Sequence, residues 1–380
     1  MTAVNPKLAR TILSELVSLP SVHPEADSGG TKQGEALMGA WVADYLGKLG
    51  ADVELRDLSK GRPNVLAVFD TVGKATATVV FAPHLDTVGV QGMTVPPFQL
   101  SARGGRLYGR GTSDTKGPTA ALFAALAHWS RSKARRRTRV RWTVVATAGE
   151  EQGSLGAEFL CEGRLKADFA IALEPTNLEV VTAAKGVLRV RITVAGRAAH
   201  GSTPQKGINA IYGMMPIMQE IRGGISRRLA SIRHPLLGRA TVNMGSISGG
   251  GELNIVPDRC ALGLEFRTHP RCTGRAILKI LRKAIASHCP GARMEILRDC
   301  PAFVTDRVGE WPVRMRRASR GWATADWFCD ANIFSGHGIP AVAFGPGKIE
   351  QAHTADEYIA ERDLLDGARA FLQILLSPPV

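Results

Sequence analysis

The amino-acid sequence predicts an α/β protein, in which a mixed sheet flanked by helices is interrupted by a smaller α+β unit. Three observations support this fold class. Residues 1–185 alternate strand-like apolar runs with helix-like segments, which is typical of a sheet with helices on its faces. From residue 186 onward the sequence becomes β-rich. The chain, at 380 residues, is also long for a single hydrophobic core, which favours two domains of unequal size.

The composition is that of a globular protein, with 44% hydrophobic and 22% charged residues and no long polar tract. Residues 1–22 alternate polar and apolar side chains at helical spacing and lack the unbroken apolar stretch of a signal peptide. No segment is apolar over the roughly 18 residues that a membrane span requires. We therefore expect a cytoplasmic protein with no membrane partner.

Four apolar, strand-like runs belong to the larger domain, and they lie at residues 75–88, 139–151, 167–176 and 339–347. A helical stretch, TAALFAALAHWSR, separates the first run from the second. Polar and charged residues directly follow each run. Because open α/β sheets place their sites beyond the carboxyl ends of the strands, we expect the chemistry of the protein at these positions.

The inserted unit is predicted at residues 186–297, where β-rich runs alternate with helical segments at 207–223 and 273–288. The larger domain then resumes and comprises residues 1–185 and 298–380, so it is discontinuous in sequence.

Neither the cysteines nor the basic runs indicate a further function. The six cysteines show no CxxC pairing, which argues against a thiolate zinc site and a disulfide scaffold. The net charge is +14, with arginines gathered at 134–141, 222–239 and 314–320. These runs lack interleaved aromatic residues, so we interpret them as solvated faces that attract anionic small substrates, and we expect no nucleic-acid partner.

Five candidate metal ligands follow strand-like runs or lie in the turns between them, and they are His84, Asp114, Glu151, Glu174 and His353. Taken singly, such a histidine is more often a hydrogen-bonded loop residue, and such a carboxylate is usually only solvated. Carboxylate and imidazole groups gathered at neighbouring strand ends can instead hold two divalent metals. The combination therefore points to a hydrolase.

Two of these candidates have informative neighbours. Asp86 lies two positions after His84, so its carboxylate can accept the free N–H of the imidazole and orient the ring toward a metal. Asp114 lies in the glycine-rich segment GRGTSDTKG, which leaves its carboxylate free to bridge two ions. The alternative for Asp114 is an ordinary surface turn that favours Gly and Asp.

Adjacent Glu150 and Glu151 follow a strand directly. Two charged carboxylates in a partly buried cleft would repel each other, and a cation beside one of them would relieve that repulsion. The other carboxylate is then free to transfer protons at neutral pH.

Several strings occur in one order along nearly the whole chain, and they are HLD, GRGTSDTKG, GEEQGS, LEPT, GRAAHGSTP, GGGELNIVPD, FRT, CDANIF and GPGKIEQAHTADEY. Together they resemble the di-zinc aminoacylase and carboxypeptidase family, which contains acetylornithine deacetylase, succinyl-diaminopimelate desuccinylase, aminoacylase and glutamate carboxypeptidases. The resemblance implies a zinc-peptidase-like sheet with an inserted ferredoxin-like dimerisation or lid domain. It also implies a cofactor of two divalent metal ions, zinc first, with cobalt or manganese as alternatives.

The same resemblance implies roles for the matched residues of the larger domain. His84, Asp114 and Glu174 would bind one metal, and Asp114, Glu151 and His353 the other. Glu150 would act as general base and acid, and Asp86 would orient His84. The turn at Gly345 to Gly347 would line the pocket.

In the inserted domain, the resemblance implies that His200 stabilises the oxyanion by reaching the active site of a partner subunit. Asn254 and Arg267 would contact the substrate, the arginine through two parallel hydrogen bonds to a carboxylate. The chain departs from the family in having Thr115 and Pro118 around Lys116, and residues 304–325 contain none of the matching strings.

The expected activity is hydrolysis of the amide bond of an N-acyl amino acid, most like that of acetylornithine deacetylase, with a place in amino-acid biosynthesis. Succinyl-diaminopimelate hydrolysis and a dipeptidase or carboxypeptidase activity are the alternatives within the family. A metal-binding protein without catalytic activity is the remote alternative. The expected partners are a small N-acyl amino acid or dipeptide and a second copy of the chain, paired through the inserted domain.

Overall fold

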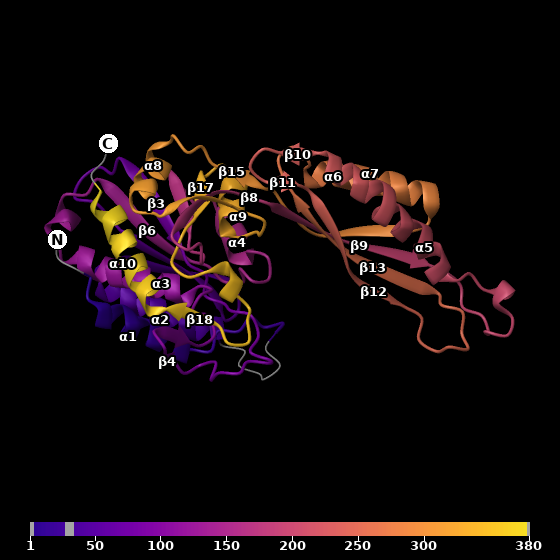
Figure 1. Cartoon of the computed structure of the whole chain (residues 1–380), viewed down its shortest axis with the longest axis horizontal. Coiled ribbons are helices and arrows are strands. Elements are labelled where there is room, and N and C mark those ends of the chain that lie inside the picture. Colours follow the sequence, from indigo (N-terminus) through magenta and orange to yellow (C-terminus); the bar gives the residue numbers. More distant parts are fainter. Residues whose placement is uncertain (1–3, 27–33, 378–380) are drawn as a thin grey trace. The chain divides into compact units, whose positions relative to one another are not determined.

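The computed structural model describes residues 4–26 and 34–377, and these residues form two compact units (Figure 1). Unit 1 contains the residues up to Thr182, then Thr305–Ala323, then the residues from Cys329 onward. Unit 2 contains Ala183–Val304 and Thr324–Phe328. Among the described residues, no helix is long and apolar enough to cross a membrane.

The core of unit 1 is a mixed sheet. Its strands are β1 (Asp52–Ser59), β2 (Arg62–Phe69), β6 (Val140–Ala146), β3 (Ala77–Ala82), β7 (Phe169–Ala172), β17 (Ala341–Ala343) and β8 (Glu179–Ala184), in that spatial order. The four neighbours β6, β3, β7 and β17 run parallel to one another, whereas β1, β2 and β8 pair antiparallel. The four parallel strands are the four runs that the sequence predicts, and the predicted fold class is confirmed.

Helices α1 (Pro6–Ser18), α2 (Gly34–Lys48), α3 (Lys116–Ser130) and α10 (Glu361–Leu376) contribute to one hydrophobic cluster with the sheet. Alternate residues of β3, Val79 and Phe81, join this cluster. Helix α3 packs against both α1 and α10 (Figure 1), which explains why nearly all of its residues are buried and most are apolar. Elsewhere in unit 1, α9 (Asp330–Gly336) packs against β7, β17 and α4 (Leu155–Glu162).

A small second sheet of unit 1 joins distant parts of the chain. Strand β5 (Arg106–Tyr108) pairs with β4 (Ser101–Arg103) on one side and with β18 (Tyr358–Ala360) on the other. The antiparallel register places Tyr358 opposite Tyr108. The segment just before β18 is therefore held beside the segment just after β5. The remaining elements of unit 1 are α8 (Glu310–Arg317), η1 (Lys133–Arg136) and η4 (Ile349–Gln351).

Unit 2 has the chain order of a ferredoxin-like fold. Its elements are β9 (Gly186–Ala195), α5 (Ala210–Glu220), β12 (Thr241–Gly249), β13 (Arg259–Thr268), α7 (Gly274–His288) and β14 (Arg293–Cys300). The sheet is antiparallel with the order β12-β13-β9-β14. Helices α5 and α7, with α6 (Ser226–Ser231), lie along one of its faces (Figure 1). On β9, buried Val190 and Ile192 alternate with exposed Arg189 and Arg191, so the opposite face is open and polar.

Shorter elements complete unit 2, and they are η2 (Pro204–Lys206), η3 (Ile221–Ile225), β10 (Arg233–His234), β11 (Gly238–Arg239) and β15 (Phe303–Val304). Strand β15 pairs with the end of β8, and β16 (Gly321–Ala325) also pairs with β8. Unit 2 is longer than the expected insertion, because residue 297 lies inside β14. That strand continues to Cys300, which pairs with Val187 of β9.

Candidate active site

The loops that follow the parallel strands of unit 1 carry most of the candidate residues. His84 comes two residues after β3, Glu150 and Glu151 come shortly after β6, and Glu174 comes two residues after β7. Since neighbouring parallel strands end at the same edge of a sheet, these loops lie together. The main chain joins two of them directly, because the Leu85 N–H donates to the carbonyl of Thr147 at 2.7 Å.

Asp114 lies between two imidazole rings. Its Oδ1 is 3.0 Å from Nε2 of His84, and its Oδ2 is 3.3 Å from Nε2 of His353. The same nitrogen of His353 is 3.1 Å from Oε2 of Glu151. Ligand atoms of His84, Asp114 and Glu151 all lie within 4.8 Å of one another. One carboxylate thus faces two imidazoles with separate oxygens, which is the geometry a ligand shared by two cations needs.

His353 adopts a left-handed backbone conformation, with φ of 64°. Such a conformation costs a non-glycine residue free energy, and histidine adopts it more often than most residue types do. Here it accompanies an imidazole that contacts both Asp114 and Glu151.

The electrostatics of this cluster match a cation site. Burial raises the pKa of Glu150 and Glu174 well above the usual value, and the charges of neighbouring carboxylates raise it further. Burial also raises the pKa of Glu151, with a further contribution from Asp114. So many buried carboxylates are costly unless positive charge compensates them.

The imidazoles supply part of that compensation. Hydrogen bonds with Asp114 and Glu151 raise the pKa of His353 to about 10. For His84, burial works in the opposite direction, but hydrogen bonds with Asp114 and Asp86 raise its pKa well above the usual value. The neighbouring carboxylates thus favour the protonated, positively charged form of both rings. With oxygen and nitrogen donors and surplus acidity, the cluster fits divalent cations.

Asp86 orients His84 in a different way from the one the sequence suggests. The Nδ1–H of His84 donates to the main-chain oxygen of Asp86 at 2.9 Å, while the nearest carboxylate oxygen is 3.6 Å away. This bond fixes the ring so that Nε2 faces Asp114. The Asp86 carboxylate instead accepts the N–H groups of Glu150 and Glu151, at 3.0 and 3.1 Å. It therefore holds the double-glutamate turn as well as the histidine.

Residues that the sequence did not single out support the same turn. The Gly149 N–H donates to Oε1 of Glu35 at 2.8 Å, and the Ala148 N–H donates to Oδ1 of Asn64 at 3.0 Å. The guanidinium of Arg62 pairs with Glu35. Glu35 and Arg62 lie far from the glutamates in sequence, in α2 and β2. No local pattern could reveal them.

The turn that carries Asp114 is supported by buried charges. Glu357 and Arg110 form an ion pair at 2.9 Å, and both are almost fully buried. Lys116, also buried, donates through Nζ to the carbonyl of Leu19 at 2.8 Å. Burial lowers the pKa of Lys116 to about 7. Glu357 belongs to the string GPGKIEQAHTADEY, but its type and position alone indicate no role.

The predicted glycines of the pocket wall contact the same loops. A Cβ on Gly345 would lie 2.7 Å from the carbonyl oxygen of Glu174. A Cβ on Gly347, where φ is 89°, would lie 2.7 Å from Oγ of Ser113. Both positions therefore need glycine for the chain to approach so closely.

Asp330 and Cys329 lie at the start of α9, close to the carboxylates of this site. Asp330 accepts a hydrogen bond from Oγ1 of Thr147 at 2.6 Å, and burial raises its pKa. Burial and the charges of Glu174 and Glu150 raise the pKa of the Cys329 thiol well above its usual value.

His200, Asn254 and Arg267 belong to unit 2. Two neighbouring loops carry His200 and Asn254, because the Gly201 N–H donates to the Asn254 carbonyl at 2.6 Å. Nδ1 of His200 is 2.6 Å from Oγ of Ser202. Arg267 lies near the end of β13, and its Nη2 is 2.7 Å from Oε1 of Glu265. Arg267, which the sequence predicts to bind the substrate, therefore has a carboxylate partner within its own strand.

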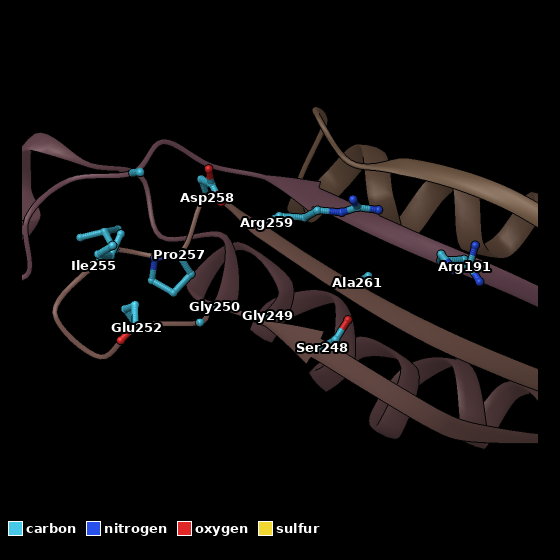
Figure 2. Close-up of a pocket in the computed structure, with 13 residues that line it drawn as sticks. Arg191, Ser248, Gly249, Gly250, Glu252, Ile255, Pro257, Asp258, Arg259 and Ala261 are labelled. Carbon is cyan, nitrogen blue, oxygen red and sulfur yellow. The ribbon is translucent and has the colours of Figure 1, made fainter.

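Unit 2 also has an open pocket of about 810 Å³ on the polar face of its sheet (Figure 2). Arg191 and Arg259 reach it from adjacent strands, and Glu252 and Ile255 reach it from the loop after β12. None of the predicted site residues lines this pocket.

Known proteins resemble this chain along nearly its whole length. The acetylornithine deacetylase of Proteus mirabilis is 30% identical over 357 residues, which cover 91% of this chain and 90% of that protein. The acetylornithine deacetylase of Edwardsiella ictaluri is 30% identical over 379 residues, which cover 95% of each.

Solved structures share the fold. A metallo-carboxypeptidase of the M20 family from Sulfolobus solfataricus superimposes with a TM-score of 0.80 at 20% identity, over 97% of this chain and 98% of that one. A tripeptidase from Staphylococcus aureus gives a TM-score of 0.79 at 22% identity, over 98% of both chains. The model of peptidase family M20/M25/M40 matches residues 80–377. With this match and the cluster around Asp114, the chain belongs to peptidase family M20/M25/M40.

Proposed function

We propose that this protein is a metal-dependent hydrolase that cleaves the amide bond of an N-acyl amino acid, in the manner of an acetylornithine deacetylase. The observation that carries the proposal is Asp114, whose two oxygens face His84 and His353, with Glu151 in the same cluster. Half-buried Glu150, the sequence neighbour of Glu151, is free to transfer protons. The two deacetylases at 30% identity support the choice of reaction.

Two divalent cations would complete the site. In this proposal His84, Asp114 and Glu174 hold one cation, Asp114, Glu151 and His353 hold the other, and zinc is the first choice, with cobalt or manganese as alternatives. When bound, the cations would polarise the scissile carbonyl and make a water molecule more acidic. The contacts of Asp114 with His84 and His353, and of Glu151 with His353, support this assignment. Burial and then mutual repulsion raise the pKa values of Glu150, Glu151 and Glu174, and added positive charge would stabilise their ionised forms.

Glu150 is the proton carrier in the proposed reaction. Its N–H is held by Asp86, which fixes the main chain of the turn. Burial favours the protonated form of its carboxyl, so a proton taken from the attacking water would be held and then delivered to the leaving amine. The products would be a carboxylate and a free amine.

Residues of unit 2 would recognise the rest of the substrate. Arg267 would pair with the free carboxylate of the amino acid, Asn254 would contact the substrate, and His200 would stabilise the oxyanion from a second copy of the chain. Exposed apolar side chains on the edge strand β12 and in the loop after it support pairing of two copies there, and they include Met244, Ile247, Leu253 and Ile255. The protein would act in the cytoplasm.

A substrate panel tests the proposal. Full-length protein loaded with zinc, cobalt or manganese would be assayed for amine release from N-acetylornithine, N-succinyl-diaminopimelate and dipeptides. We expect N-acetylornithine to give the highest kcat/KM, and a chelator to abolish turnover. Preferred cleavage of the succinylated compound or of dipeptides would replace the substrate assignment. Metal binding without amine release from any of them would favour a non-catalytic metal-binding protein.

A further inference from the structure

Glu357 lies just before β18 and is fully buried in unit 1. It is not one of the candidate ligands, yet its carboxylate contacts the main chain of Asp114. We propose that Glu357 is a positioning residue that holds Asp114 in place for the metal centre. The inference rests on the proposed function, because it takes Asp114 to be the ligand shared by two cations.

The hydrogen bonds of Glu357 show what it does. Oε1 accepts the N–H groups of Ser113 and Asp114, at 2.8 and 3.0 Å. Oε2 accepts the N–H of Gly111 at 2.8 Å and Nη1 of Arg110 at 2.9 Å. An ionised carboxylate has about four acceptor positions. Because these contacts fill them, the carboxylate has no position left for a cation or a substrate, and it acts through the chain that it holds.

The turn at residues 109–115 depends on this support. It lies between β5 and α3. Gly111 has φ of 83°, and a side chain at this position would collide with buried Lys116. Buried N–H groups without an acceptor are costly, so removal of the Glu357 carboxylate would leave the turn free to move toward other partners. Movement of the Asp114 main chain would displace both of its carboxylate oxygens.

Glu357 also connects the two sides of the candidate metal centre. His353 lies four residues earlier in the same segment, and its imidazole contacts Oδ2 of Asp114. The Gly109 N–H donates to the main-chain oxygen of Glu357 at 3.2 Å, next to the pairing of β5 with β18. One short segment therefore supplies a candidate ligand and fixes the turn that carries another.

A purely structural role is the competing explanation, since removing one partner of the buried ion pair with Arg110 also destabilises the fold. The two roles differ in what they predict for metal binding. Loss of a structural ion pair lowers the melting temperature of the metal-free protein and leaves the metal affinity unchanged. Loss of a positioning residue weakens metal binding and alters the coordination geometry.

The variants Glu357→Gln and Glu357→Ala separate these roles. Glutamine keeps the size of the side chain and one acceptor oxygen, and it serves if the alanine variant fails to fold. Glu310→Gln is the control for the loss of an ion pair with a buried arginine, because Glu310, whose side chain is 47% exposed, pairs with buried Arg314 in α8. Metal-free full-length protein would be titrated with Co²⁺, with visible absorption to report geometry, a competing chelator to report affinity, and thermal unfolding in chelator to report stability.

We expect Co²⁺ to bind about 10–100-fold more weakly to Glu357→Gln, the usual effect of losing a residue that orients a ligand, with a changed absorption spectrum. Glu310→Gln should keep the affinity and spectrum of the unchanged protein. Equal Co²⁺ affinity and spectra in the Glu357 variants, whatever their melting temperatures, would overturn the positioning role alone. Failure of the unchanged protein to bind Co²⁺ would overturn the metal centre, and the positioning role with it.

Discussion

Glu150 and Glu151 are neighbours in sequence but differ in their contacts. Glu151 pairs with His353, whereas the pKa of Glu150 is raised by burial, then by the charge of Glu174, with no hydrogen bond to an imidazole. This difference separates a ligand from a proton carrier. Because of this difference, removal of the Glu150 carboxylate and removal of the Glu151 carboxylate should have different effects on metal binding and on turnover.

Glu150→Gln should retain metal and lose nearly all turnover, because the amide cannot accept a proton. A general base contributes about 10²–10⁴-fold to a rate, so a loss of that size is expected. Asp114→Ala should lose metal instead, since both imidazoles would lose their shared carboxylate. Metal content and amine release, measured on the same preparations, check both. Substantial turnover by Glu150→Gln would show that another group carries the proton.

Arg267 gives a prediction about substrate affinity. Its Nη2 pairs with Glu265 at 2.7 Å, so a substrate carboxylate would compete with a residue of the same strand. Arg267→Met should raise KM for N-acetylornithine by about 10–100-fold, which corresponds to one hydrogen bond to a charged group, with a smaller effect on kcat. Steady-state kinetics would measure this.

Glu265→Gln is the companion variant. It removes the internal competitor and should lower KM, because Arg267 would then be free to pair with the substrate. If Arg267→Met had the KM of the unchanged protein, the arginine would not be the carboxylate anchor.

Among the elements of unit 1, the start of α4 packs closely against the chain that leads into the double-glutamate turn. Gly156 lies in its first turn, and a Cβ there would collide with Oδ1 of Asn64 and lie 2.5 Å from the carbonyl oxygen of Ala148. Asn64 and Ala148 are the two residues whose hydrogen bond holds the chain before Glu150. Close packing of α4 and the end of β6 therefore fixes the position of the proton carrier.

Gly156→Ala should lower the free energy of unfolding by about 1–3 kcal/mol, as other overpacked sites do, and should reduce kcat by moving the turn. Gly47→Ala is the control within α2, where the nearest atom to a new Cβ is Cγ2 of Val53 at 3.9 Å. It should raise the free energy of unfolding by about 0.5–1 kcal/mol, because alanine favours a helix. Thermal and urea unfolding would measure both changes. Equal effects of the two variants would contradict the close packing at Gly156.

The sequence predicts the parallel strands because each is a short apolar run with a defined end. For the same reason it predicts the residues that follow them, His84, Glu150, Glu151 and Glu174. It could not predict Glu35, Asn64 or Glu357, because each holds a loop that is distant in sequence. It also could not show that the main-chain oxygen of Asp86 lies nearer to the imidazole of His84 than the carboxylate does.

At the scale of the whole molecule, the proposed pairing of two copies can be tested at the edges of the two sheets. Ile247, on the edge strand β12 of unit 2, is 54% exposed, and Leu55, on the edge strand β1 of unit 1, is 52% exposed. Edge strands offer unpaired N–H and C=O groups to a second chain, and a charged side chain discourages this pairing.

Ile247→Glu should therefore convert a dimer into monomers, and turnover should fall because His200 would lose the partner site. Leu55→Glu should leave the dimer intact. Light scattering during size-exclusion chromatography would give both masses. A fully active monomer would rule out a contribution of His200 to a second subunit.

The position of β17 in the sheet has a consequence for biosynthesis. This strand lies between β7 and β8, yet the ribosome makes it only after all of Ala183–Val304. Because the ribosome adds about 5–20 residues per second, synthesis of the residues between β7 and β17 takes roughly ten seconds or more. We expect the ferredoxin-like unit to fold during that interval, while the exposed edge of β7 needs protection by chaperones. A nascent chain arrested before Ala341 would then contain a folded unit 2 within a unit 1 that still lacks β17.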